Sequence, residues 1–200
     1  MDSAAPIRPG IFVAIVGPSG AGKDTLIDWA RAALAGEAQV NFVRRVITRP
    51  CDGMTEDHDS LDEEAFVGRL NEGHFALAWE AHGLRYGIPA SVDAAVAAGR
   101  VAVANLSRGA VGALRRRYDH VTVVEITAPA DILAARLAAR GREPPDALGA
   151  RLDRATARPA STPADFVIDN GGGRRQGGER LVAIIRAAVA RAETARDLGS

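Results

Sequence analysis

The sequence predicts an α/β fold in which a five-stranded parallel sheet is flanked by helices. Short runs of β-branched residues alternate with helical stretches along the chain, a pattern typical of parallel sheets with right-handed crossovers. The first run, Ile11–Val16, is apolar throughout, as expected of a strand covered on both faces. A glycine-rich turn follows it directly and leads into a helical stretch.

Five runs predict the strands of this sheet, and the stretches between them predict the helices. We expect strands at Ile11–Val16, Asn41–Ile47, Val101–Asn105, Val121–Ile126 and Phe166–Ile168. We expect helices at Lys23–Leu34, Asp62–Asn71, Ala90–Ala98, Arg108–Tyr118, Ala130–Ala139, Ala147–Ala157 and Glu179–Ala192.

Four segments depart from the simple alternation. Thr48–Ser60 is polar and contains Pro50, which predicts a loop. His74–Tyr86 predicts a small hairpin that closes near Gly83. Further along, we expect a mobile excursion and then a flexible connector before the last helix, at Arg140–Asp146 and Gly171–Gly178.

The length of 200 residues predicts a single domain over residues 1–200. Lys plus Arg total 25 and Asp plus Glu total 25, so the formal net charge of zero favours neither nucleic acid nor an anionic membrane as a partner. Cys51 is the only cysteine, which excludes an intrachain disulfide. The first ten residues lack a secretory apolar segment, and the early apolar run is too short to span a bilayer. We therefore expect a cytoplasmic protein with small-molecule substrates; the sequence carries no signal for an oligomeric state.

The glycine-rich turn fits the phosphate-binding motif G-x-x-x-x-G-K, and its place between a strand and a helix is the context that this motif requires. Backbone N–H groups and the helix N-terminus favour an anion there, and Lys23 is placed to reach the β- and γ-phosphates of ATP. This motif predicts a P-loop NTPase-type fold; a purely structural turn is the alternative. The expected ATP-binding residues here are Gly17, Pro18, Ser19, Gly20, Ala21, Gly22, Lys23, Asp24 and Thr25.

Asp24 departs from the motif, which has Ser or Thr after the lysine to ligate Mg²⁺. A carboxylate is also a hard oxygen ligand, so Asp24 is a candidate ligand for the Mg²⁺ that accompanies ATP. The alternative is an acidic residue favoured in the first helical turn by the helix dipole.

Several arginines lie around the expected excursion Arg140–Asp146. Arg140 and Arg151 flank it, so a closing loop would aim both at a transferring phosphoryl group, and with Lys23 they are the expected catalytic residues. Arg136 and Arg154 are assigned instead to solvated helix faces.

Several ordered motifs resemble the guanylate kinase family over nearly the whole chain. They are GPSGAGKD, Thr48-Arg49, Trp79 with Gly83-Leu-Arg-Tyr86-Gly87, Arg-Leu-Ala-Ala-Arg140-Gly, Arg151-Leu and Val167-Ile-Asp-Asn170. The resemblance implies a core with an acceptor-binding insertion at about 43–88 and a lid at about 139–150. It also implies that Asn170 lies near the adenine of ATP.

The departures from that family concern the contacts that read guanine. The glutamate before the hairpin tryptophan is Ala78 here, and the serine before the Thr-Arg pair is Arg45. A second phosphate-binding arginine is replaced by Asp52, and a tyrosine by His58. The pocket thus keeps Arg49 and Tyr86 as phosphate contacts, loses base contacts and gains a cation.

This pattern favours a small bis-phosphorylated sugar and resembles the ribose 1,5-bisphosphate phosphokinase family of the carbon–phosphorus lyase pathway, part of phosphonate metabolism. That resemblance implies transfer from ATP to ribose 1,5-bisphosphate, giving 5-phosphoribosyl 1-diphosphate (PRPP). The alternatives are a guanylate kinase with altered base recognition and a non-catalytic guanylate-kinase-like interaction module. The expected acceptor contacts are Arg45, Arg49, His58, Tyr86, Ser107 and Arg108.

Overall fold

The computed structural model describes residues 5–49, 58–139 and 163–198 of the 200-residue chain. The expected helix Ala147–Ala157 and the excursion Arg140–Asp146 lie outside these residues. Within them, no helix combines the length and apolar character needed to cross a membrane.

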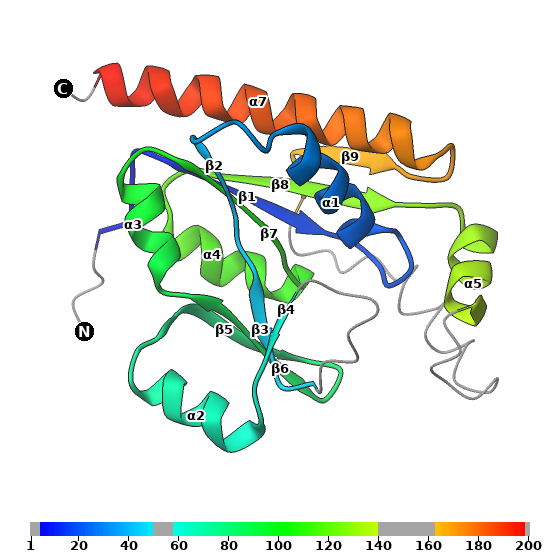
Figure 1. Ribbon diagram of the computed structural model, residues 1–200, viewed down its shortest axis with the longest axis horizontal. Coiled ribbons are helices and arrows are strands. Elements are labelled where there is room, and N and C mark those ends of the chain that lie inside the picture. Colours follow the sequence, from blue (N-terminus) through cyan, green and yellow to red (C-terminus); the bar gives the residue numbers. More distant parts are fainter. Residues whose placement is uncertain (1–4, 50–57, 140–162, 199–200) are drawn as a thin grey trace.

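A five-stranded parallel sheet, here called the core sheet, forms the centre of the fold (Figure 1). Its order is β2 (Val40–Phe42), β7 (Val101–Asn105), β1 (Ile11–Val16), β8 (Val121–Thr127) and β9 (Phe166–Asp169), and every neighbouring pair is parallel. All residues of β1 and β7 are buried, which confirms that the continuous apolar runs are strands covered on both faces.

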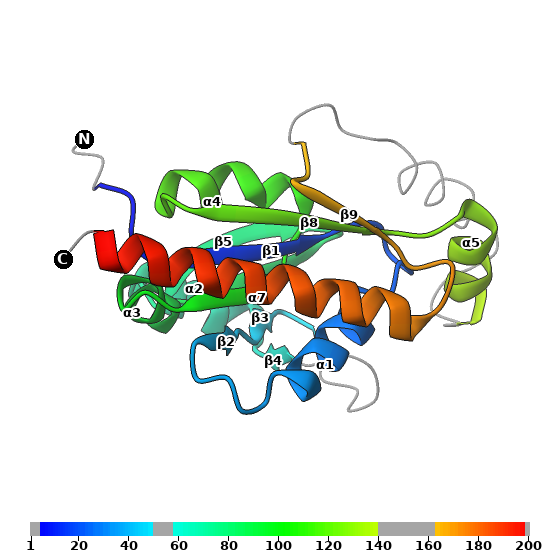
Figure 2. The same cartoon turned by 90° about the horizontal axis from the view of Figure 1, so that it is seen from above.

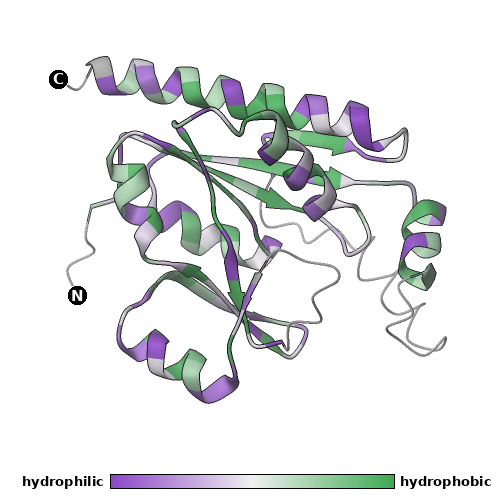
Figure 3. Cartoon of the chain, in the orientation of Figure 1, coloured by the Kyte–Doolittle hydropathy of each residue, from purple (hydrophilic) through white to green (hydrophobic). Residues whose placement is uncertain are grey.

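Successive residues of β1 enter two separate hydrophobic clusters, because side chains alternate between the faces of a strand. Val13 packs with α1 (Lys23–Ala33) and α7 (Arg174–Leu198), while Phe12 packs with α3 (Ser91–Ala97) and α4 (Val111–Arg117). Figure 2 shows α4 on one side of the sheet and α1 with α7 on the other, and Figure 3 shows the apolar strands between them. A 3₁₀ turn at Arg108–Ala110 precedes α4, and α5 (Ala130–Ala139) follows β8.

A second, four-stranded sheet, here called the small sheet, lies beside the core. Its order is β4 (His58–Ser60), β3 (Arg45–Ile47), β6 (Leu84–Pro89) and β5 (Phe75–Ala81), with α2 (Glu63–Asn71) alongside. The β5–β6 hairpin confirms the expected one: His82 and Gly83 have φ of 54° and 72°, as a two-residue type I′ turn requires.

The expected strand Asn41–Ile47 is in fact two strands in different sheets. β2 pairs with β7 in the core sheet, the chain turns away at Val43 and Arg44, and β3 pairs with β6 in the small sheet. Arg44 and Arg45 interrupt the apolar pattern at this crossing, but the local sequence does not show that the two halves pair with strands of different sheets. The end of the predicted loop Thr48–Ser60 is also a strand, because β4 pairs with β3 through its backbone.

The predicted flexible connector is wrong for its last five residues, since α7 begins at Arg174. Gly177 and Gly178 are buried where α7 crosses α1. A Cβ on Gly178 would lie 2.3 Å from Cδ1 of Trp29, and one on Gly177 would lie 3.0 Å from Cδ1 of Leu26. These glycines permit close packing of two helices and do not provide flexibility.

Candidate active site

The turn after β1 has the backbone that an anion-binding loop requires. Gly17, Gly20 and Gly22 have φ of 142°, 85° and 87°, which side-chain-bearing residues rarely adopt. A Cβ on Gly17 would also lie 2.0 Å from the carbonyl oxygen of Ile126 on β8. All three glycines are therefore needed for the backbone conformation of the loop, and Gly17 is needed also for the close packing of the loop against β8.

Lys23, the only lysine in the chain, lies over this loop. Its Nζ donates hydrogen bonds to the carbonyl oxygens of Gly17 at 3.0 Å and Pro18 at 2.9 Å. The ammonium is thus held at the mouth of the loop, where it would meet an anion bound by the loop N–H groups.

The loop is braced from behind by two side chains. Asn170 Nδ2 donates to the carbonyl oxygen of Ala21 at 2.8 Å, and an Arg136 terminal nitrogen donates to the carbonyl oxygen of Asn170 at 3.0 Å. The other terminal nitrogen of Arg136 donates to the carbonyl oxygen of Gly20 at 3.4 Å. Asn170 is only 3% exposed, so its observed role is to hold the loop, and contact with adenine stays a prediction.

Arg136 therefore differs from the solvated arginine expected from sequence. Arg136 is the first residue of the segment Arg-Leu-Ala-Ala-Arg140, one of the motifs that resemble the guanylate kinase family. Its place in that motif was the sequence signal for a functional role. Arg140 and Arg151, expected to be catalytic, lie outside the described residues, as does nearly all of the expected lid.

The phosphate loop forms one wall of a cleft at the carboxyl ends of β1 and β7, where open parallel sheets bind ligands. The cleft is lined by Gly17, Ser19, Gly20, Gly22, Lys23, Asp24, Arg45, Arg49, His82, Tyr86, Asn105, Leu106 and Ser107. It brings together most of the residues expected at the ATP and acceptor sites, from the core and the small sheet.

Asp24 contacts residues from both sides of the cleft, the core sheet and the small sheet. Its Oδ1 accepts a 2.7 Å hydrogen bond from Asn105 Nδ2 and lies 3.5 Å from a guanidinium nitrogen of Arg45. Asn105, which is 6% exposed, is the last residue of β7 and is not among the site residues expected from the sequence. The signal for Asn105 was its polar side chain at the end of an otherwise apolar strand.

The side of the cleft formed by the small sheet is an aromatic wall. Trp79 stacks on Tyr86 with ring centroids 5.4 Å apart and planes inclined by 9°. Its indole Nε1 donates to Ser107 Oγ at 2.8 Å, and the Arg45 guanidinium carbon lies 6.0 Å from the Tyr86 ring centroid. Trp79 thus connects the small sheet to the loop after β7 of the core, in addition to its packing within the hairpin.

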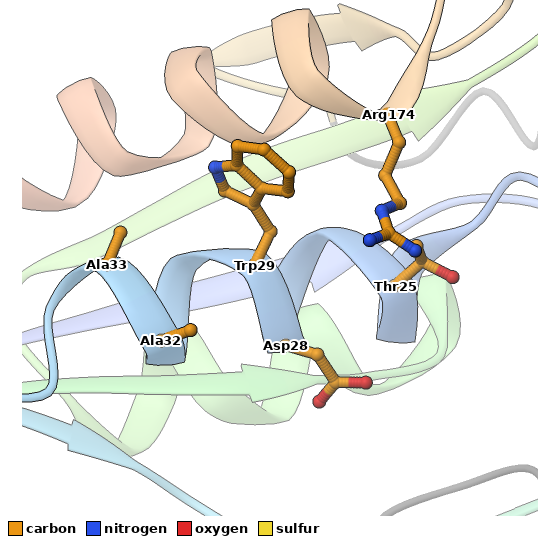
Figure 4. Close-up of a pocket in the computed structure, with 6 residues that line it drawn as sticks. All are labelled: Thr25, Asp28, Trp29, Ala32, Ala33 and Arg174. Carbon is orange, nitrogen blue, oxygen red and sulfur yellow. The ribbon is translucent and has the colours of Figure 1, made fainter.

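Three expected site residues are placed differently or in part. Arg108 pairs with Glu125 at 2.7 Å and does not line the cleft. Thr25 lies on the outer face of α1, in a separate hollow with Trp29 and Arg174 (Figure 4). The backbone of His58 pairs opposite Arg45, and its side chain is outside the description. Ligand contacts by these three residues stay predictions, as do those of the other expected site residues.

Asp24 is the only carboxylate among the described residues that line the cleft. Magnesium is usually held by one or two carboxylates together with substrate phosphates, so this single acidic oxygen donor beside the phosphate loop fits Mg²⁺ bound with a nucleotide.

Shifted pKa values occur far from this cleft. Burial, together with a 2.6 Å hydrogen bond to Asp93, raises the pKa of Tyr118 above its ordinary value. The hydrogen bond from Arg117 to the same carboxylate raises the pKa of that guanidinium. This cluster joins α3 to the end of α4 and has a structural role.

Comparison with known proteins gives a consistent picture. The crystal structure of guanylate kinase from Anaplasma phagocytophilum superposes with a TM-score of 0.65, at 20% identity, over 90% of this chain and 87% of that one. No family model matches the chain. A "Ribose 1,5-bisphosphate phosphokinase PhnN" from Brucella melitensis is 51% identical over 163 residues, covering 82% of this chain and 85% of the relative. One from Pseudofrankia inefficax is 50% identical over 179 residues, covering 90% and 92%.

The fold is guanylate-kinase-like, and the cleft is built on a P-loop. The relatives named as phosphokinases show that the chain is a P-loop kinase. At these levels of identity and coverage, the chain belongs to the ribose 1,5-bisphosphate phosphokinase family. The fold class and the family predicted from the motifs are both confirmed.

Proposed function

We propose that this protein transfers the γ-phosphoryl group of ATP to ribose 1,5-bisphosphate, giving ADP and 5-phosphoribosyl 1-diphosphate. The observation that carries the proposal is the single cleft in which the phosphate loop faces Arg45, Arg49 and Tyr86. The position of the guanine-reading glutamate is occupied by Ala78, which offers no acceptor atom on its side chain.

On the donor side, the loop N–H groups and Lys23 bind the β- and γ-phosphates of ATP. Asp24 would hold Mg²⁺, which supplies charge neutralisation between the phosphate oxygens when bound. Asn170 and Arg136 keep the loop in its binding shape through its carbonyl groups.

On the acceptor side, Arg49 and Tyr86 bind one phosphate and Arg45 binds the other. An oxygen of the 1-phosphate attacks the γ-phosphorus while the bond from that phosphorus to the bridging oxygen of ADP breaks. Because the attacking oxygen is already anionic at neutral pH, the reaction needs no strong general base. The task of the site is to overcome repulsion between anions by positioning and positive charge.

We also propose that residues 43–88 act as the acceptor-binding insertion and residues 139–150 as a lid that brings Arg140 to the transferring group. Arg151 has the same role from the far side of the lid.

An acceptor screen tests the proposal. With Mg²⁺ and ATP held constant, kcat/KM is measured for ribose 1,5-bisphosphate and for GMP, following ADP release. We expect ribose 1,5-bisphosphate to be the better acceptor by at least about a hundredfold, because the pocket lacks the polar groups that read a base. Efficient turnover of GMP without turnover of the sugar would identify a guanylate kinase instead. Failure to bind ATP and Mg²⁺ at millimolar concentration would favour a non-catalytic module.

A further inference from the structure

One ion pair links the ATP side of the cleft to its acceptor side. Asp24 lies in the first turn of α1, directly after Lys23, and Arg45 begins β3 of the small sheet. Their charged atoms are 3.5 Å apart, and the two side chains are 28% and 11% exposed. The pair is therefore shielded from solvent far more than an ordinary surface pair.

Each residue of this pair also has a second expected partner: Mg²⁺ for Asp24 and an acceptor phosphate for Arg45. The Oδ1 atom of Asp24 that faces Arg45 also accepts the Asn105 amide, and Asp24 is the cleft's candidate ligand for Mg²⁺. Arg45 lies against the ring of Tyr86, where the acceptor phosphates are proposed to bind. Its planar fork of N–H donors suits a phosphate as well as a carboxylate.

Binding of Mg²⁺ to Asp24 competes with the Asp24–Arg45 ion pair, because both interactions use the negative charge of the same carboxylate. A divalent cation bound to Asp24 would take up the negative charge that holds Arg45 and would place a like charge beside the guanidinium. An acceptor phosphate would then be the better partner for Arg45. Without the metal, Asp24 and the acceptor phosphate compete for the same guanidinium.

We propose that Arg45 exchanges partners during the reaction: Asp24 holds it until ATP and Mg²⁺ bind, and it then binds a phosphate of the acceptor. This inference rests on the proposed function. Arg45 is on this view a substrate-binding residue that couples the two sites, so nucleotide with Mg²⁺ and acceptor tighten each other's binding. The coupling is reciprocal by thermodynamic linkage.

The coupling is measured by calorimetric titration of ribose 1,5-bisphosphate into the full-length protein. The titration is done alone, with a β,γ-non-hydrolysable ATP analogue plus Mg²⁺ at saturation, and with the analogue plus EDTA. For the native protein we expect the acceptor Kd to fall at least about fivefold with analogue plus Mg²⁺ and less with the analogue plus EDTA.

Two variants separate partner exchange from a merely structural ion pair. Asp24→Asn keeps the shape and the oxygen that accepts from Asn105 but removes the charge that holds Arg45. Its acceptor Kd without nucleotide should therefore fall below that of the native protein, and the coupling should disappear. Arg45→Gln should raise the acceptor Kd under all conditions and show no coupling.

Arg44→Gln is the matched control, because Arg44 is the preceding residue, is 54% exposed and pairs with Asp59 at 3.3 Å. It should keep the native coupling. Absence of coupling in the native protein, or native-sized coupling in Asp24→Asn or Arg45→Gln, would overturn the partner exchange. If the native protein turns over ribose 1,5-bisphosphate without coupling, only this inference fails; if it neither binds nor turns over that acceptor, the proposed function fails too.

Discussion

The indole Nε1 of Trp79 donates a 2.8 Å hydrogen bond to Ser107 Oγ, and this bond joins the β5–β6 hairpin to the loop after β7. Trp79 also stacks on Tyr86, which lines the cleft. The position of this aromatic wall relative to the phosphate loop thus depends in part on one bond between the hairpin and the loop after β7.

Replacing Trp79 by Phe should loosen that wall while leaving an aromatic ring against Tyr86. We expect the KM for the acceptor to rise about three- to tenfold and the KM for ATP to stay unchanged, because about 1 kcal/mol of hydrogen bonding is lost on one side of the cleft only. Steady-state kinetics with each substrate varied in turn provide the measurement.

The chain offers a matched control in Trp29→Phe, which makes the same change between α1 and α7, away from the cleft (Figure 4). That variant should leave the acceptor KM unaltered. Ser107→Ala should reproduce the effect of Trp79→Phe, and the double variant should add little to either. Equal increases in both KM values would count against this role of Trp79.

Removing the Lys23 ammonium should abolish most turnover without unfolding the protein. We expect Lys23→Ala to lower kcat at least about a hundredfold, since a charge aimed at the transferring phosphates is lost. The melting temperature should change little, because Lys23 is only partly buried and its hydrogen bonds to Gly17 and Pro18 lie within one loop. An unaltered rate would remove Lys23 from the mechanism.

Because Lys23 is the only lysine, chemical labelling gives a second test. An amine-acylating reagent can modify this side chain and the α-amino group alone. Mass spectrometry should show that ATP with Mg²⁺ protects Lys23 and leaves the α-amino group reactive. Equal labelling of Lys23 with and without nucleotide would contradict its place at the phosphates.

Gly178→Ala should destabilise the contact between α1 and α7. The added methyl group would lie 2.3 Å from Cδ1 of Trp29, so we expect a loss of about 1–3 kcal/mol in the free energy of unfolding. Gly68→Ala is the control, since Gly68 lies inside α2 with no atom within 4 Å of an added Cβ. It should stabilise the protein by about 0.5–1 kcal/mol. Urea denaturation of both variants measures the difference, and similar effects would refute the packing role of Gly178.

The Tyr118–Asp93 hydrogen bond predicts a loss of stability at alkaline pH. Burial and this bond raise the pKa of Tyr118 in the folded state, so the unfolded chain gives up the phenol proton first, near pH ~10. The stabilisation is complete below that pH and is lost as the pH rises towards the folded pKa, at up to about 1.4 kcal/mol per pH unit.

Tyr118→Phe isolates this contribution. The variant should be less stable than the native protein at pH 8, and the difference should shrink as the pH is raised from 9 to 11. Urea denaturation at each pH provides the free energies of unfolding. A difference that stays constant over this range would show that Tyr118 does not titrate as its burial requires.

The sequence was sufficient for the phosphate loop and for every strand of the core sheet except β2, because these depend on local signals. The continuous apolar runs at β1 and β7 and the glycine spacing before Lys23 each specify their own structure. The hairpin turn at Gly83 is local in the same sense.

The features that could not be predicted from the sequence depend on contacts between distant segments. The split between β2 and β3 is a change of partner strand, and the pairing of β4 with β3 is a backbone contact that its polar residues do not signal. The bonds of Arg136 to the phosphate loop cross more than a hundred positions, and so does the packing of Gly178 on Trp29. In each case the residue type was visible, and its partner was not.

The acceptor side of this cleft is proposed to bind a sugar bisphosphate and to reject a nucleoside monophosphate. The most direct measurement is a competition: equal concentrations of ribose 1,5-bisphosphate and GMP are incubated with the protein, ATP and Mg²⁺, and the products are followed by ³¹P NMR. We predict that the diphosphate signals of 5-phosphoribosyl 1-diphosphate appear while GMP is unchanged. Formation of GDP with the ribose bisphosphate left intact would contradict the account.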